Sequence, residues 1–252
     1  MASKISASFR VIKLLKNFPI YFADYFHLKK GIILYRLRNG IRYLIRAGTT
    51  DRFIINEIWL HKIYSPKGFE IKKQDVVVEV GGHIGVFTIY AASRAKKVYV
   101  FEPSPENFSL LSKNIKINYL KNVDARTSAL SNKDGFKELS ISEDENKGSN
   151  SFYLLNNGSE KIKVKTESAA KFFSSIKSNI DLLKMDCEGA EYEILFSLSP
   201  KIIRKIRKIA MEYHNIDEKR NIRTLAAFLR KNGFKLRYKG SHIGSLYAIN
   251  TS

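Results

Sequence analysis

A glycine-rich turn directly follows the apolar run VVVEV at residues 76–80. It combines an acid near the end of the run with residues suited to ligand contact, namely Glu79, Gly81, Gly82, His83 and Gly85. Glycine in such a turn permits positive φ angles and a close approach of the main chain to a ligand. The spacing G-G-H-I-G is not GxGxxG, and glycine turns are common between strands and helices. On its own, the turn therefore indicates a ligand site only weakly.

Glu102 closes the second apolar run and stands 17 residues after Gly85. Its carboxylate can accept hydrogen bonds from both hydroxyls of a ribose. Together, the glycine turn and this acid predict a cofactor that contains adenosine. We expect Ser128 and Ala129, near the end of the third predicted strand, to lie beside the adenine.

Further polar side chains follow the next two predicted strands. Asp186 and Glu188 belong to the segment LKMDCEGAE, and His214 ends the segment MEYH. Because ligands bind at the carboxyl ends of the strands in an open α/β sheet, we expect these side chains to face the acceptor molecule. Each is a candidate for the base that takes a proton from the acceptor. Asp186 could instead join a divalent metal site, but the sequence does not identify the other ligands, and we predict no metal site.

Strands and helices alternate from Gln74 onward, which predicts βαβ units and a mostly parallel sheet. The strand candidates are residues 76–80, 97–101, 123–130, 180–185, 206–213, 234–238 and 245–249. The last two are close enough in the sequence to pair antiparallel. We therefore predict an α/β fold over residues 71–252, with the seven-stranded, Rossmann-like sheet of the class I methyltransferases and a closing antiparallel hairpin. We expect the polar stretch from Glu143 to Asn150 to be mobile.

Residues 1–70 do not follow this alternation, and we predict that they form a basic, helical N-terminal extension. Residues 1–50 contain ten Lys or Arg and one acid, and residues 201–240 contain thirteen and three. Apolar residues recur at helical spacing in the extension: Val11, Leu14, Leu15, Phe18, Phe22, Tyr25 and Phe26. Such basic amphipathic helices could bind an anionic membrane surface. The favoured interpretation is that their apolar face packs on the sheet.

Composition excludes several classes of protein. The single cysteine, Cys187, excludes an intramolecular disulfide and a Cys-rich zinc site. No uncharged apolar run approaches the roughly 18 residues of a membrane-spanning helix, and no secretory signal is evident. We therefore expect a soluble, cytoplasmic protein, with peripheral membrane contact as an open alternative.

The sequence resembles the FkbM-type methyltransferases. The matching segments are VVVEVGGHIGVFTIYAA, VYVFEPSPENFSLLSKNIKIN, TSALSNKDG, LLKMDCEGAEYEIL and MEYH, within residues 46–214. The resemblance implies S-adenosylmethionine as cofactor and O-methylation of a hydroxyl on a sugar, glycolipid or small metabolite. Three positions depart from the usual pattern: His83 replaces Asn, Gly82 replaces Ala, and Ala170 replaces an acid.

Other functions fit the sequence less well. The net charge of +20 raises the possibility of an RNA methyltransferase, but there is no N/D-P-P-Y segment and no Pro-Cys pair. A non-catalytic, membrane-associated binding module would not need the acids at the strand ends. An NAD-dependent dehydrogenase would be expected to carry GxGxxG. Nucleic acid is thus the less favoured partner, and the oligomeric state is left open.

Overall fold

The computed structural model describes residues 9–141, 150–152 and 160–251. All but the last residue of the polar stretch Glu143 to Asn150 lies outside the described residues, as do residues 1–8 of the basic extension. None of the helices in these ranges is long and apolar enough to cross a bilayer.

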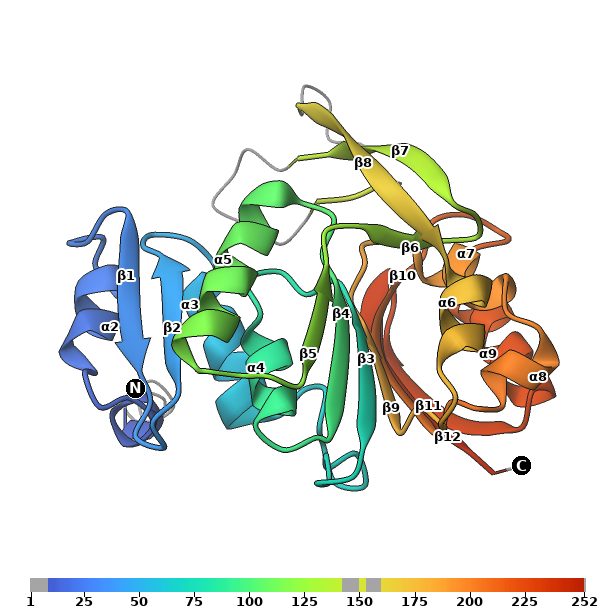
Figure 1. Ribbon diagram of the computed structural model, residues 1–252, viewed down its shortest axis with the longest axis horizontal. Helices are drawn as coiled ribbons and strands as arrows, with labels where there is room; N and C mark the ends of the chain where they lie inside the picture. The colour runs from blue at the N-terminus through green and yellow to red at the C-terminus, as the bar shows by residue number, and fades with distance from the viewer. Residues whose placement is uncertain (1–8, 142–149, 153–159, 252) are drawn as a thin grey trace.

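A seven-stranded sheet forms the centre of the molecule (Figure 1), in the order β11-β12-β10-β9-β3-β4-β5. Its strands are β3 (Val76–Val80), β4 (Lys97–Phe101), β5 (Val123–Arg126), β9 (Leu182–Met185), β10 (Lys208–His214), β11 (Phe234–Gly240) and β12 (Ile243–Asn250). Strands β10, β9, β3, β4 and β5 pair in parallel, whereas β12 runs antiparallel to both β10 and β11. This is the predicted class I methyltransferase sheet with its closing hairpin.

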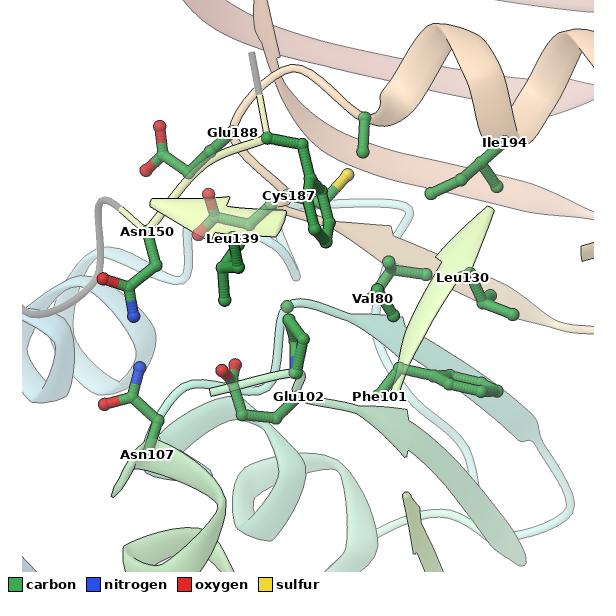
Figure 2. Close-up of a pocket in the computed structure, with 16 residues that line it drawn as sticks. Val80, Phe101, Glu102, Asn107, Leu130, Leu139, Asn150, Cys187, Glu188 and Ile194 are labelled. Atoms are coloured by element: carbon green, nitrogen blue, oxygen red, sulfur yellow. The ribbon is translucent and has the colours of Figure 1, made fainter. Parts of the chain in front are cut away.

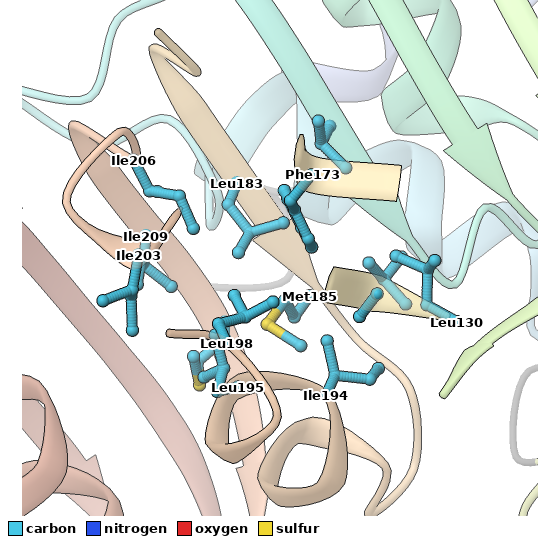
Figure 3. Close-up of a cluster of buried hydrophobic side chains, with 14 of the residues drawn as sticks. Leu130, Phe173, Leu183, Met185, Ile194, Leu195, Leu198, Ile203, Ile206 and Ile209 are labelled. Carbon is cyan, nitrogen blue, oxygen red and sulfur yellow. The ribbon is translucent and has the colours of Figure 1, made fainter. Parts of the chain in front are cut away.

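Helices cover both faces of this sheet (Figure 1). One face carries α4 (Val86–Ala92) and α5 (Pro105–Ile117), and the other carries α6 (Ala169–Ser175), α7 (Glu191–Phe196), α8 (Pro200–Ile203) and α9 (Ile222–Lys231). Val78 and Val80 of β3 join the apolar cluster on one face, and Val77 joins the cluster on the other. Figure 3 shows part of the first cluster, with Leu183 and Met185 of β9 near Phe173 of α6. A strand that is buried on both faces reads as a continuous apolar run, which is why the sequence revealed β3 so clearly.

The N-terminal extension is only partly helical. Residues 9–14 are helical, followed by α2 (Pro19–Tyr25), α3 (Asp51–Asn56) and the π-helix η1 (Glu57–His61). Between them lies an antiparallel hairpin that we did not predict, formed by β1 (Ile32–Arg36) and β2 (Arg42–Arg46). Tyr35 and Tyr43, one on each strand, are fully buried. The hairpin therefore forms a second core layer, and Val11 and Leu15 pack in the same cluster as Val77 of the sheet.

The third predicted strand is wrong in one respect, because residues 123–130 do not form one strand. The chain leaves the central sheet after Arg126, and β6 (Ala129–Ser131) joins a separate small sheet with β7 (Gly135–Ser140) and β8 (Lys161–Ser168). Ala129 and Leu130 of β6 and Leu139 of β7 line a pocket together with Val80 at the end of β3. The small sheet therefore covers the carboxyl ends of the central strands.

Candidate functional site

The main chain of the turn after β3 packs directly against the main chain of the loop after β9. Gly81 has φ +82°, and a Cβ atom built there would lie 1.7 Å from the carbonyl oxygen of Asp186. The N–H groups of Gly81 and Gly82 both donate to the carbonyl of Phe101 at 3.0 Å, which ties the turn to the end of β4. A side chain at position 81 would collide with main chain, so only glycine allows three strand ends to meet here.

Glu102 lies directly beside this turn. Its Oε2 accepts from the N–H of His83 at 2.7 Å, and its Oε1 accepts from the N–H of Ser104 at 2.9 Å. The residue is 5% exposed, and burial raises the pKa of its carboxyl to about 7, against the lowering effect of the two N–H donors. Both oxygens are thus oriented by main chain, and each keeps acceptor capacity for a ligand hydroxyl.

An apolar pocket opens between the turn and the small sheet (Figure 2). Its walls include Val80, Phe101, Ala129, Leu130, Leu139, Phe152 and Ile194, with Glu102, Asp186, Cys187 and Glu188 among the polar residues. Ala129, one of the two residues expected beside the adenine, thus lines this pocket. Ser128 does not contribute to this wall, because it is buried and its hydroxyl donates to Glu167 at 2.7 Å.

A second, acidic pocket adjoins the first. Its acidic residues are Glu57, Glu79, Glu102, Asp186, Glu188 and Glu212, and the other lining residues include Tyr64, Gly81, Gly82, His83 and Lys184. The two pockets share Gly81, Glu102, Asp186 and Glu188. The structure thus brings Gly81 and Glu102, from the candidate cofactor residues, to one junction with two of the three candidate bases, whereas Gly85 and Ser128 line neither pocket.

Two side chains that the sequence analysis missed fix the position of Asp186. The hydroxyl of Tyr64 donates to Asp186 Oδ2 at 2.9 Å, and Lys184 Nζ lies 3.8 Å from the same oxygen. Burial and the charge of Asp186 raise the pKa of Tyr64 well above its ordinary value, so the hydroxyl keeps its proton. Lys184 is 3% exposed, donates to the carbonyl of Gly81 and lies 3.5 Å from Glu79. A lysine inside a buried strand is unusual, and that was the available sequence signal.

Glu79 is buried beneath the turn and faces Lys184. It accepts a hydrogen bond from the hydroxyl of Thr88 at 2.6 Å. Burial raises the pKa of its carboxyl to about 7, although Lys184 acts in the opposite direction.

His214 is surrounded by carboxylates. Its Nδ1 lies 3.0 Å from Glu191, and its Nε2 lies 3.2 Å from Glu188 and 3.5 Å from Glu212. Burial alone would lower the pKa of His214, but the hydrogen bonds to these carboxylates outweigh it and raise the pKa to about 12. The imidazole therefore carries its proton at neutral pH and holds Glu188 and Glu212 in place.

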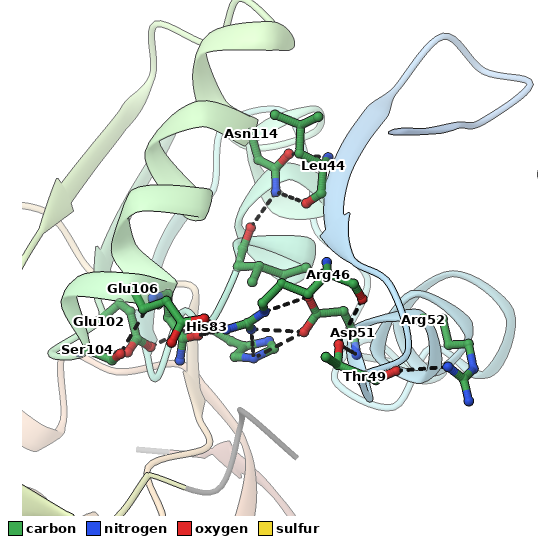
Figure 4. Close-up of polar contacts among 12 residues, drawn as sticks. Leu44, Arg46, Thr49, Asp51, Arg52, His83, Glu102, Ser104, Glu106 and Asn114 are labelled. Atoms are coloured by element: carbon green, nitrogen blue, oxygen red, sulfur yellow. Dashed lines mark hydrogen bonds and ion pairs between the residues drawn. The ribbon is translucent and has the colours of Figure 1, made fainter. Parts of the chain in front are cut away.

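His83 connects the turn to the N-terminal extension (Figure 4). Arg46 Nη2 donates to His83 Nε2 at 2.9 Å. Burial lowers the pKa of His83 to about 4, and Arg46 adds to this effect while Asp51 opposes it, so the ring is a neutral acceptor. Arg46 also pairs with the fully buried Asp51 at 3.0 Å and donates to Asn107 at 2.9 Å. The hairpin thus reaches the edge of the site through Arg46.

No group of three or more His, Cys, Asp or Glu side chains is arranged as a metal site in residues 9–141, 150–152 and 160–251. The acidic residues of the second pocket are instead spread over η1 and the ends of β3, β4, β9 and β10.

The sequence matches the family described as the methyltransferase FkbM domain over residues 79–236. "Methyltransferase 1" of Beauveria bassiana is 25% identical over 204 residues, which cover 72% of this chain and 80% of that protein. The "31-O-demethyl-FK506 methyltransferase FkbM" of Streptomyces tacrolimicus is 25% identical over 232 residues, covering 79% and 87%. Among solved structures, a methyltransferase FkbM from Methylobacillus flagellatus KT aligns with a TM-score of 0.49 and 13% identity, covering 71% of this chain and 44% of that one.

Proposed function

Because the chain belongs to the FkbM methyltransferase family, we propose that it transfers the methyl group of S-adenosylmethionine to a hydroxyl group of a sugar, glycolipid or other small metabolite. The observation that carries this proposal is the junction of the two pockets. The acid suited to hold a ribose, Glu102, and the candidate base, Asp186, line the same junction. A cofactor seated on one side would therefore meet an acceptor seated on the other.

The apolar pocket suits the adenosine half of the cofactor. A purine would pack among side chains such as Phe101, Ala129 and Leu139, and the ribose hydroxyls would donate to Glu102. Gly81 and Gly82 have no side chains, so the main chain would lie directly beside the ligand. Gly85 leads the turn into α4. Glu79, with Lys184, would help to position the cofactor's amino-acid end in the acidic pocket. Ser128 would act only indirectly, through Glu167.

When bound, S-adenosylmethionine supplies a methyl group that is already activated by its sulfonium. The protein then has to align an acceptor oxygen and remove its proton. Asp186 is placed to take that proton as the hydroxyl oxygen forms its bond to the methyl carbon and the carbon–sulfur bond breaks. Tyr64 and Lys184 hold the carboxylate in position. We assign His214 a positioning role rather than that of the base, because it already carries a proton.

The charge of the second pocket favours an acceptor rich in hydroxyl groups. Among the residues that the structure describes, six acidic side chains and one lysine line this pocket, and Lys184 already lies near two of the acids, Glu79 and Asp186. Hydroxyl groups can donate hydrogen bonds to carboxylates, whereas phosphate groups would be repelled by them. The net charge of +20 therefore lies elsewhere on the chain and does not make the site itself a nucleic-acid site.

An assay with radiolabelled S-adenosylmethionine tests the proposal. The full chain would be incubated with separate fractions of glycolipid, soluble glycan, small metabolites and RNA. We expect label in a base-stable linkage in one of the first three fractions. Label confined to RNA would overturn the acceptor class, and no label in any fraction would count against catalysis.

Two variants connect that activity to the site. Asp186→Asn and Glu188→Gln should each lower turnover at least about tenfold, because a positioned base contributes about 10²–10⁴-fold. Affinity for S-adenosylhomocysteine, measured by calorimetry, should stay near the wild-type value. The control is Glu138→Gln, a carboxylate whose side chain is 73% exposed. Full turnover in Asp186→Asn would show that Asp186 is not the base.

A further inference from the structure

The turn that follows α2 exposes an unusual density of large apolar side chains. Every residue from 25 to 32, sequence YFHLKKGI, is exposed. Tyr25 is 47% exposed, Phe26 64%, Leu28 74% and Ile32 51%. We call residues 25–32 the exposed turn. Isolated apolar residues on a surface are ordinary, but four within eight consecutive positions form a patch of the kind that marks an interaction site.

The position of the exposed turn does not follow from the helical pattern in the sequence. Of the apolar positions predicted at helical spacing, Val11 and Leu15 are buried, and Leu14, Phe18 and Phe22 are partly buried against the same cluster, so most of them face the core. Tyr25 and Phe26 belong to the same pattern but lie outside the core, in edge-to-face contact with each other at 5.3 Å. Of the apolar residues at helical spacing, those at the end of α2 and in the turn after it are therefore the ones available to a partner.

The exposed turn is connected to the lining of the acidic pocket through α3. Arg52 lies over the rings of both Tyr25, at 5.7 Å, and Phe53, at 4.6 Å, which brings these two aromatic residues together. Phe53 is 44% exposed, and the next residue, Ile54, lines the acidic pocket. Figure 1 shows the turn between α2 and β1 at the upper left edge of the molecule. Helix α3 thus contacts the exposed turn through Arg52 and lines the acidic pocket through Ile54.

The charges in the exposed turn are all of one sign. Lys29 and Lys30 are both exposed, and the turn contains no acid. The nearest acid along the chain, Asp24, is fully buried and bonded to Tyr35 and Gly48. Aromatic and aliphatic side chains next to lysines match the interface of an anionic bilayer, where rings enter the headgroup region and lysines meet lipid phosphates.

We propose that the exposed turn, together with Phe53, docks the protein on an anionic phospholipid surface with the acidic pocket beside that surface. The docking brings the site to an acceptor hydroxyl held near the headgroups. It requires neither the cofactor nor the acceptor, so it can be tested separately from methyl transfer.

Co-sedimentation of the full chain with vesicles tests this directly. One set of vesicles contains phosphatidylcholine alone and the other contains phosphatidylcholine with phosphatidylglycerol, each at low and high salt. We expect binding to the phosphatidylglycerol vesicles at low salt and much weaker binding under the other conditions. Absence of binding to phosphatidylglycerol vesicles at low salt overturns the proposal.

Matched variants separate local docking from general charge. Lys29→Glu/Lys30→Glu and the control Lys116→Glu/Lys121→Glu both change the net charge from +20 to +16, since each substitution removes one positive and adds one negative charge. The first pair should lower vesicle binding at least about fivefold per lysine, the factor that corresponds to about 1 kcal/mol. The control should retain most binding. If both pairs lose vesicle binding equally, the effect depends on net charge alone and the proposal is overturned.

The apolar part has its own control. Phe26→Ser/Leu28→Ser removes side chains that are already exposed, so the fold should tolerate it, and we expect vesicle binding to fall at least about tenfold. Tyr119→Ser is the control, because Tyr119 is 79% exposed and contacts Arg42, at the opposite end of β2 from Arg46. The proposal fails if Phe26→Ser/Leu28→Ser leaves vesicle binding unchanged. It also fails if light scattering shows that the wild type is a dimer and that these substitutions dissociate it, because the turn would then form a contact between copies of the chain.

Discussion

Two main-chain N–H groups hold the Glu102 carboxylate in place before any ligand reaches it. A side chain positioned in this way loses little entropy on binding a ribose, so its hydrogen bonds contribute nearly in full. We expect Glu102→Ala to weaken binding of S-adenosylhomocysteine at least about tenfold, because hydrogen bonds to a charged group contribute about 1.5–3 kcal/mol. Calorimetry measures the effect, with Glu138→Ala as the surface control. Equal affinity in the wild type and Glu102→Ala would remove Glu102 from the ribose contact.

Individual site residues were predictable to the extent that they follow strands. Glu102, Asp186 and Glu188 each stand just beyond the end of a strand, and parallel strands bring their carboxyl ends to one edge. Tyr64 was not predictable, because it lies 122 residues from Asp186 and follows no strand. The role of His214 was also beyond the sequence. Three carboxylates surround its ring, and that arrangement depends on how the loops after β9 and β10 pack.

Among the elements, the N-terminal hairpin affects the site through Arg46 and His83. Replacing His83 by alanine removes the acceptor of this contact but leaves the buried Arg46–Asp51 pair intact. We expect His83→Ala to weaken S-adenosylhomocysteine binding several-fold, because the turn loses one of its restraints, while the melting temperature changes little. His83→Asn keeps a side-chain acceptor and should retain most of the affinity. A large fall in melting temperature for His83→Ala, with unchanged affinity, would assign the contact to stability alone.

The elements themselves were predictable in unequal measure. The strands of the central sheet appear as β-branched runs because they are buried on both faces. The hairpin was missed although its signal was present: Asn39-Gly40 separates two runs in which buried positions alternate with less buried ones. The division of residues 123–130 into β5 and β6 had no such signal. It results from pairing of β6 with β8, which begins more than thirty residues later.

At the scale of the whole molecule, stability should depend on the charge of His214. Its pKa is raised from an ordinary 6.5 to about 12 in the fold, so the stabilisation is complete below about pH 6.5 and is lost as the pH rises toward 12. The wild type should therefore lose melting temperature between about pH 7 and pH 10 more steeply than His214→Gln. The difference between the two curves reports on His214 together with the carboxylates that it faces, Glu188, Glu191 and Glu212. Parallel curves would show that the imidazole is not held in its charged form.

The chain has one thiol, and it lies in the wall of the apolar pocket. Cys187 is the only cysteine among 252 residues, so any reaction with a thiol reagent reports on this pocket alone. Burial raises the pKa of the thiol well above its ordinary value, which makes the reaction slow and easy to follow by absorbance. We expect S-adenosylhomocysteine to slow the modification in proportion to its occupancy of the pocket. The chain unfolded in urea should react quickly, at a rate that S-adenosylhomocysteine does not change. The rate at which the natural Cys187 reacts thus reports ligand occupancy, with no engineered residue required.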